Sequence, residues 1–208
     1  MPPSPPAIPP LTPSKSRKMV IAIVLIVVVA SSIAFGFVYT QTSLFRSQAA
    51  SQPAAGYNAY SNYGFSFQYL KTWTITEHGL QNNVADSNSG IVIAQAPTGQ
   101  EDLVLVGWTR SVYYVNGSTA LATAVEGFRS GSHGSGLTMG QENTATTKAG
   151  YKVYLLPFSV TISGTQISGV WSAWYSTQGQ RLYQLSVVTS GTGVSSMYDT
   201  SLSSFVEL

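Results

Sequence analysis

The stretch that decides the fold is KVYLLPFSVTI at residues 152–162, followed by SGVWSAWYS at 168–176 and RLYQLSVV at 181–188. Apolar side chains recur at every second position, which is the period of a strand with one buried face. In the first stretch, the residues expected to share one face are Tyr154, Leu156, Phe158, Val160 and Ile162. These three stretches are predicted to be neighbouring strands.

The joints between the three stretches are short and contain glycine. They read SGTQ at 163–166 and QGQ at 178–180. Hairpin connections have this length and composition. We therefore predict an antiparallel meander over residues 152–188.

Four earlier runs also alternate with period two. They are GFSFQY at 64–69, TWTIT at 72–76, GIVIAQA at 90–96 and DLVLVGW at 102–108. We expect each of them to form a strand of the same fold.

Two other stretches have the period of a helix. The first carries Leu121, Val125 and Phe128, with Ser118 or Thr119 as the expected N-cap. The second carries Val194, Tyr198, Leu202 and Phe205. The order of strands and helices predicts an α+β fold in which helices flank an antiparallel sheet.

The N-terminal region has the pattern of a membrane anchor. Residues 19–39 (MVIAIVLIVVVASSIAFGFVY) carry no charge, and a helix of that length spans about 30 Å of hydrocarbon. Lys15, Arg17 and Lys18 precede it, and only Arg46 follows soon after. The positive-inside rule then places the N-terminus in the cytoplasm and the chain after Thr40 outside the cell membrane.

Two other interpretations of residues 19–39 stay open. One is a cleaved signal peptide with Ser32-Ile33-Ala34 as the cleavage site, although 21 apolar residues exceed the usual apolar region of such peptides. The other is a pilin-like assembly segment, for which SRKM at 16–19 lacks the expected small residue before a processing site. All three interpretations export the rest of the chain.

The segments on either side of the apolar stretch have the composition of irregular chain. Residues 1–18 form a proline-rich cytoplasmic tail, which we expect to be disordered. Residues 40–56 are rich in Ser, Gln and Ala and are expected to be a flexible linker. The exported domain is predicted to cover residues 57–208.

Composition excludes several classes of function. The chain has no cysteine, so thiolate catalysis and thiolate metal sites are excluded. Residues 57–208 hold six basic and eight acidic side chains and give no basic face for phosphates, so nucleic acid is not an expected partner.

The exported region resembles the PsbP-like domain family. The resemblance starts at YSNYGFSFQYLKTW (60–73), where YGFSF and a following Trp mark the first strands of that family. It continues through GYKVY at 150–154, LYQL at 182–185 and a last helix that ends in SSF at 203–205. The resemblance implies an α-β-α sandwich and a non-enzymatic role as an accessory domain.

Aromatic side chains are the candidate contact surface. Trp108, Trp171, Trp174 and Tyr175 lie on predicted strands, and Trp171 with Tyr175 should face away from Trp174. If helices cover both faces of the sheet, both sets belong to the core. If one face is open, they form a groove for a protein, a glycan or a hydrophobic ligand.

The sequence offers weak signals for other sites. Asn116-Gly117-Ser118 is the candidate N-glycosylation site. His133 beside serines, or His78 and His133 with Glu77 around zinc, are candidates of low specificity. Asp86 opens a segment like the start of a calcium loop, but the rest of that pattern is absent and a turn is expected. No cofactor is expected.

These observations predict a single-pass, membrane-anchored extracytoplasmic domain that is not an enzyme and that binds a protein of the cell envelope. The alternative is an extracytoplasmic domain that binds or senses a small ligand. A third hypothesis, an envelope hydrolase that uses His133, has the weakest basis.

Overall fold

The computed structural model describes residues 52–79, 85–97, 102–131, 136–162, 164–191 and 194–208. The predicted tail, the predicted transmembrane helix and most of the predicted linker lie outside them. No helix within these ranges is long and apolar enough to span a membrane.

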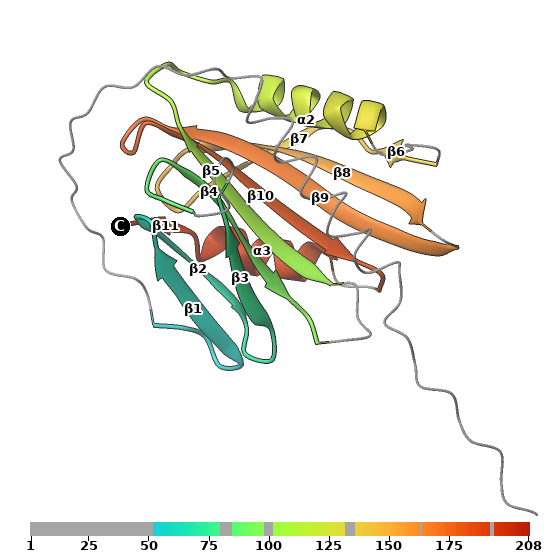
Figure 1. Cartoon of the computed structure of the whole chain (residues 1–208), viewed down its shortest axis with the longest axis horizontal. Coiled ribbons are helices and arrows are strands. Elements are labelled where there is room, and N and C mark those ends of the chain that lie inside the picture. The colour runs from blue at the N-terminus through green and yellow to red at the C-terminus, as the bar shows by residue number, and fades with distance from the viewer. Residues whose placement is uncertain (1–51, 80–84, 98–101, 132–135, 163, 192–193) are drawn as a thin grey trace, which may run out of the picture.

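The described residues form two antiparallel sheets and two helices, which is an α+β fold (Figure 1). The eight-stranded sheet has the order β3 (Thr74–His78), β4 (Ser89–Gln95), β5 (Leu103–Arg110), β10 (Arg181–Thr189), β9 (Thr165–Ser176), β8 (Lys152–Ile162) and β6 (Thr138–Met139), and β7 (Asn143–Thr146) also pairs with β8. The three-stranded sheet has the order β1 (Tyr57–Asn62), β2 (Phe65–Leu70) and β11 (Val206–Glu207). The helices are α2 (Gly117–Gly131) and α3 (Val194–Ser203).

The predicted meander is confirmed as the run β8, β9, β10. Ile162 pairs with Thr165, and Ser176 pairs with Arg181, so both connections are hairpins. The strand β8 covers the predicted range 152–162 without change. β10 pairs with β5 on its other side, which places the meander next to the earlier strands.

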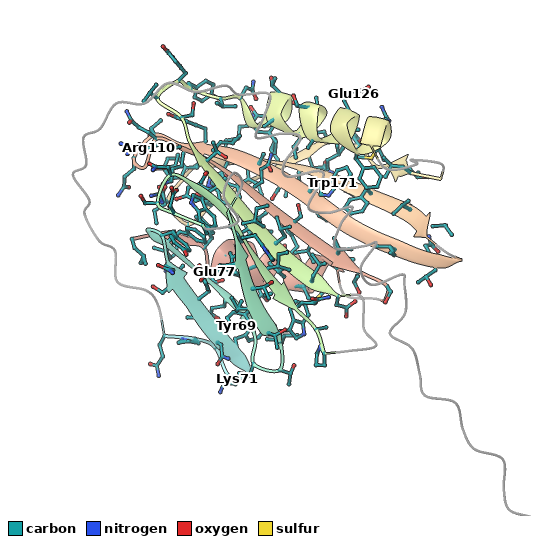
Figure 2. The ribbon with its side chains drawn as sticks, in the orientation of Figure 1. Tyr69, Lys71, Glu77, Arg110, Glu126 and Trp171 are labelled. Atoms are coloured by element: carbon teal, nitrogen blue, oxygen red, sulfur yellow. The ribbon has the colours of Figure 1, made fainter. Side chains whose placement is uncertain are left out.

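Each face of the large sheet has its own apolar core. Trp171 packs under α2 against Phe128 and Phe158 (Figure 2). Trp174 belongs to the opposite core, which α3 and the small sheet cover. Figure 1 shows α2 on one side of the large sheet and α3 with β1 and β2 on the other. Both faces of the large sheet are therefore buried. This is the first of the two cases considered from the sequence, in which the aromatic side chains on both faces belong to the core.

The last predicted helix is shorter than its apolar period. α3 ends at Ser203, and the Phe205 amide donates to the Leu202 carbonyl at 3.1 Å. Phe205 is still buried in the core beside α3, and the next two residues pair with β2 as β11. The apolar period of α3 extends to Phe205 because the Phe205 side chain packs in the same core, although the helix itself ends two residues earlier.

The turn between β1 and β2 brings the small sheet onto the large one. Tyr63 and Gly64 both have positive φ, at 50° and 81°, which is the geometry of the common two-residue hairpin turn. Positive φ is rare for an aromatic residue. The Tyr63 ring stacks on Trp108 with centroids 5.0 Å apart, and its carbonyl accepts a hydrogen bond from Arg181 at 2.5 Å. These contacts hold the turn.

Candidate functional site

Two adjacent tyrosines stand out on the surface of the described residues. Tyr113 is 67% exposed and Tyr114 is 69% exposed, and they are the large hydrophobic side chains that this part of the chain leaves in solvent. Both lie on the connection between β5 and α2. Exposed aromatic rings that gather in one place are typical of contact surfaces.

The loop that carries these tyrosines is held by hydrogen bonds to the meander. The Ser111 amide donates to the Gln180 carbonyl at 2.7 Å, and the Tyr175 hydroxyl donates to the Ser111 carbonyl at 2.7 Å. The Tyr114 ring meets Tyr175 edge-on, with centroids 5.5 Å apart and an interplanar angle of 76°. We call Tyr113, Tyr114 and Tyr175 the tyrosine surface.

The start of α2 fixes the other end of the loop. The Asn116 side-chain oxygen accepts the Ser118 amide at 2.9 Å, so Asn116 caps the helix instead of the predicted Ser118 or Thr119. The Ser118 hydroxyl donates to the Glu142 carboxylate at 2.9 Å. A Cβ on Gly117 would lie 2.5 Å from the Ala173 carbonyl oxygen, so only glycine allows this close approach.

The structure places the four predicted aromatic residues differently. Trp108, Trp171 and Trp174 are 1%, 3% and 0% exposed, so all three indole rings are core side chains. Trp108 donates from its ring nitrogen to the Asp86 carbonyl at 2.9 Å. Tyr175 is half-buried, and it is the one of the four that takes part in the tyrosine surface.

Tyr113 and Tyr114 were not among the contact residues predicted from the sequence. They follow the β5 pattern, and the alternation that identifies a strand says nothing about residues beyond its end. The sequence did contain one signal, which is that the two tyrosines are adjacent. Two neighbouring bulky side chains beyond the end of a strand are difficult to bury on the same face of the sheet, so exposure of at least one was to be expected.

Among the polar candidates from the sequence, Asp86 has clear structural partners. Asp86 accepts the amides of Asn88 and Ser89 at 2.7 and 2.8 Å, which is the turn that we expected instead of a calcium loop. His78 lies half-buried at the end of β3. His133 lies outside the described residues. The described residues hold no group of three or more His, Asp or Glu side chains that could bind a metal ion.

Glu77, on β3 (Figure 2), joins the small sheet to the large one. The Tyr60 and Tyr63 hydroxyls donate to its two carboxylate oxygens at 2.9 and 2.6 Å. The hydrogen bond from Tyr63 lowers the pKa of Glu77, and that same bond raises the pKa of Tyr63. Burial, followed by the bond to Glu77, raises the pKa of Tyr60.

A buried polar cluster lies on the α3 side of the sheet. Arg181, 4% exposed, donates to the carbonyls of Tyr63 and Ser87 at 2.5 and 2.8 Å and to the Tyr183 hydroxyl at 3.3 Å. Glu207, 8% exposed, accepts the Ser176 hydroxyl. Burial, followed by the charge of Glu207, raises the pKa of Tyr183. This cluster ties backbone segments together inside the protein.

The tyrosine surface is aromatic, and the charged residue Arg110 lies at the end of β5, just before the loop. The tyrosine surface offers ring faces and hydroxyl groups for contact, and its polar neighbours Ser111 and Asn116 carry no charge. Comparison of the chain with protein-family models and with curated proteins finds no match.

Proposed function

We propose that this chain is a membrane-anchored extracytoplasmic interaction domain of PsbP-like type, without enzymatic activity, that binds a protein of the cell envelope. Residues 1–18 form its cytoplasmic tail, residues 19–39 its transmembrane helix and residues 57–208 its α-β-α sandwich. The uncharged stretch and the basic residues before it support this orientation.

The observation that carries the proposal is the exposed pair Tyr113 and Tyr114, of which Tyr113 is the ring that we expect to contact the partner. Tyrosine rings supply large contact area at low entropic cost, and they are enriched where binding energy is concentrated. Both rings extend from a loop whose backbone is fixed by Gln180 and Tyr175. A fixed loop loses little freedom when a partner binds.

Five carboxylates hold hydrogen bonds within the fold. Tyr60 and Tyr63 engage one of them, and Ser118 engages another. The five are Glu77, Asp86, Asp102, Glu142 and Glu207.

The test is native mass spectrometry of the full-length protein, extracted from its own membranes in mild detergent. We expect a companion protein in stoichiometric amount. Tyr113→Ala should weaken that complex at least about tenfold, which corresponds to about 1.4 kcal/mol. Tyr57→Ala is the matched control, since Tyr57 is a half-exposed tyrosine on the small sheet.

Two outcomes would contradict the proposal. A companion that binds Tyr113→Ala as tightly as the wild type would remove the tyrosine surface from the interface. A lone chain with bound small-molecule mass would favour the alternative, a ligand-binding or sensing domain.

A further inference from the structure

We propose that Asn116 carries an N-linked glycan and that the exposed ring of Tyr114 is the platform on which its first sugar rests. The inference depends on the extracytoplasmic placement proposed above. It assigns Tyr114 to the protein's own glycan and leaves Tyr113 for the protein partner.

Asn116 has the geometry that a modified asparagine needs. It is exposed, and its side-chain oxygen accepts the Ser118 amide at 2.9 Å. Its backbone carbonyl accepts the Ala120 amide at 3.0 Å. The side-chain nitrogen Nδ2, to which a sugar is joined, takes part in neither bond. The helix cap and the modification are therefore compatible.

Tyr114 and Asn116 face the same solvent. Val115 between them is 5% exposed, whereas Tyr114 is 69% exposed and Asn116 is exposed. The two residues are separated by only one residue on the connection between β5 and α2, so their Cα atoms lie at most about 7 Å apart. A sugar joined to Asn116 is therefore within reach of the Tyr114 ring.

The Tyr114 ring is also held in place. Its edge-on contact with Tyr175 joins it to a side chain whose hydroxyl is bonded to the Ser111 carbonyl. A sugar ring presents C–H groups on its flat faces, and these pack on the electron-rich face of an aromatic ring. Such packing would cover an apolar ring that is otherwise left in water.

The transfer needs one co-reactant, an oligosaccharide joined through its anomeric carbon to a lipid diphosphate. The bond between Asn116 Nδ2 and the anomeric carbon forms. The bond from that carbon to the diphosphate oxygen breaks, and its electron pair leaves with the lipid diphosphate. Nδ2 gives up one proton, which passes to the released lipid diphosphate or to water.

The folded structure places this transfer before folding. Gly117 is buried against the Ala173 backbone, and the Ser118 hydroxyl is bonded to Glu142. An enzyme that needs the extended Asn-Gly-Ser segment cannot reach it once α2 has packed on β9. The glycan is therefore added while the chain is being exported.

The first experiment is the intact mass of the full-length protein purified from its native source, compared with Asn116→Gln. We expect a glycan mass that Asn116→Gln removes. A native chain of unmodified mass would overturn the proposal.

The second experiment tests the platform with a matched pair of variants, Tyr114→Ala and Tyr113→Ala. In each variant and in the wild type, the melting temperature of the glycosylated protein is compared with that of the same protein after enzymatic removal of the glycan, which leaves a capping side chain at residue 116. We expect the glycan to raise the melting temperature by about 3 °C in the wild type and in Tyr113→Ala. The gain should disappear in Tyr114→Ala.

An equal gain in Tyr114→Ala would overturn the role of the ring even if the glycan is present. The outcomes separate this inference from the proposed function. Loss of the companion protein in Tyr113→Ala concerns the interface, whereas glycan mass and its stabilising effect concern Asn116 and Tyr114.

Discussion

Arg181 joins parts of the chain that are far apart in sequence. Its guanidinium binds the turn at Tyr63, the loop at Ser87 and the hydroxyl of Tyr183, and Glu207 lies in the same buried region. A Cβ on Gly64 would lie 3.0 Å from an Arg181 nitrogen, so the small residue in the turn gives the guanidinium its room. A buried charge of this kind costs desolvation, and its hydrogen bonds offset that cost.

We therefore expect Arg181→Met to lower the free energy of unfolding by about 2–4 kcal/mol, because two backbone carbonyls and the Tyr183 hydroxyl lose their hydrogen-bond donor. Urea denaturation followed by tryptophan fluorescence measures this. The control is Arg129→Met in the last turn of α2, which is exposed and should change stability by less than about 0.5 kcal/mol. Similar effects of the two substitutions would refute the structural role of Arg181.

Glu77 predicts a dependence of stability on pH. Its pKa is lowered in the folded state by the bond from Tyr63, so its contribution is present above the ordinary carboxyl pKa and is lost as pH falls through the lowered value. Because Glu77 is exposed, water weakens the effect, and Glu77→Gln should cost about 0.5–1 kcal/mol at pH 7.

The measurement is the free energy of unfolding between pH 7 and pH 2.5 for the wild type, Glu77→Gln and Glu126→Gln. Glu126 is exposed on α2, away from Glu77 (Figure 2). The wild type and Glu126→Gln should lose more stability on acidification than Glu77→Gln. Parallel curves for all three proteins would contradict the role of Glu77.

At the scale of elements, strands with long alternating patterns were predictable and short ones were not. The ranges of β8 and β10 follow directly from their apolar period, as does the helix that carries Leu121 and Phe128. β6 and β11 have two residues each, and a pattern of period two cannot be recognised over two residues. They form because β8 and β2 offer free backbone groups.

The tyrosine surface and the buried polar cluster were predictable only in part, because residues far apart in the sequence build them. Tyr175 and Asn116 were recognised from their own sequence context. The buried cluster of Arg181 and Glu207 was not, because Ser176 and Glu207 are 31 residues apart and meet only through the packing of α3 and β11. Long-range polar contacts leave no local pattern in the sequence.

The start of α2 gives a prediction at this scale. Gly117→Ala would place a Cβ 2.5 Å from the Ala173 carbonyl and 2.8 Å from the Tyr154 ring, so α2 would have to move away from β9. We expect a loss of about 2–3 kcal/mol. Chemical denaturation measures it, with Thr119→Ala, an exposed position in the same turn, as the control. A change no larger than that of Thr119→Ala would show that the helix can shift freely.

At the scale of the whole molecule, the described residues form a closed α+β unit with a core on each face of its large sheet. The sequence before it is different in kind, since residues 19–39 are uncharged and residues 1–18 are rich in proline. This contrast supports an anchored domain in which folding and membrane attachment are carried by separate segments.

We therefore expect residues 52–208 alone to fold and to stay in the aqueous fraction, and the full-length chain to need detergent for extraction from membranes. Circular dichroism and ultracentrifugation of the membrane fraction test this. Replacing Val27 and Val28 by lysine should abolish membrane retention, because two charges in the apolar stretch oppose insertion. A native product that is soluble and lacks residues 1–34 would instead indicate a cleaved signal peptide.

The pairing of β2 with β11 sets the order of events during biogenesis. Phe65 pairs with Glu207, so the strand that emerges early from a ribosome or a translocation channel has no neighbour on one side until residue 207 has also passed through. Until then the edge of β2 at Phe65 and Ser66 lacks its second strand neighbour and is free to bind wrong partners. Completion of the domain thus waits for the late-emerging strand, and a chaperone that shields residues 65–70 during this interval would raise the yield.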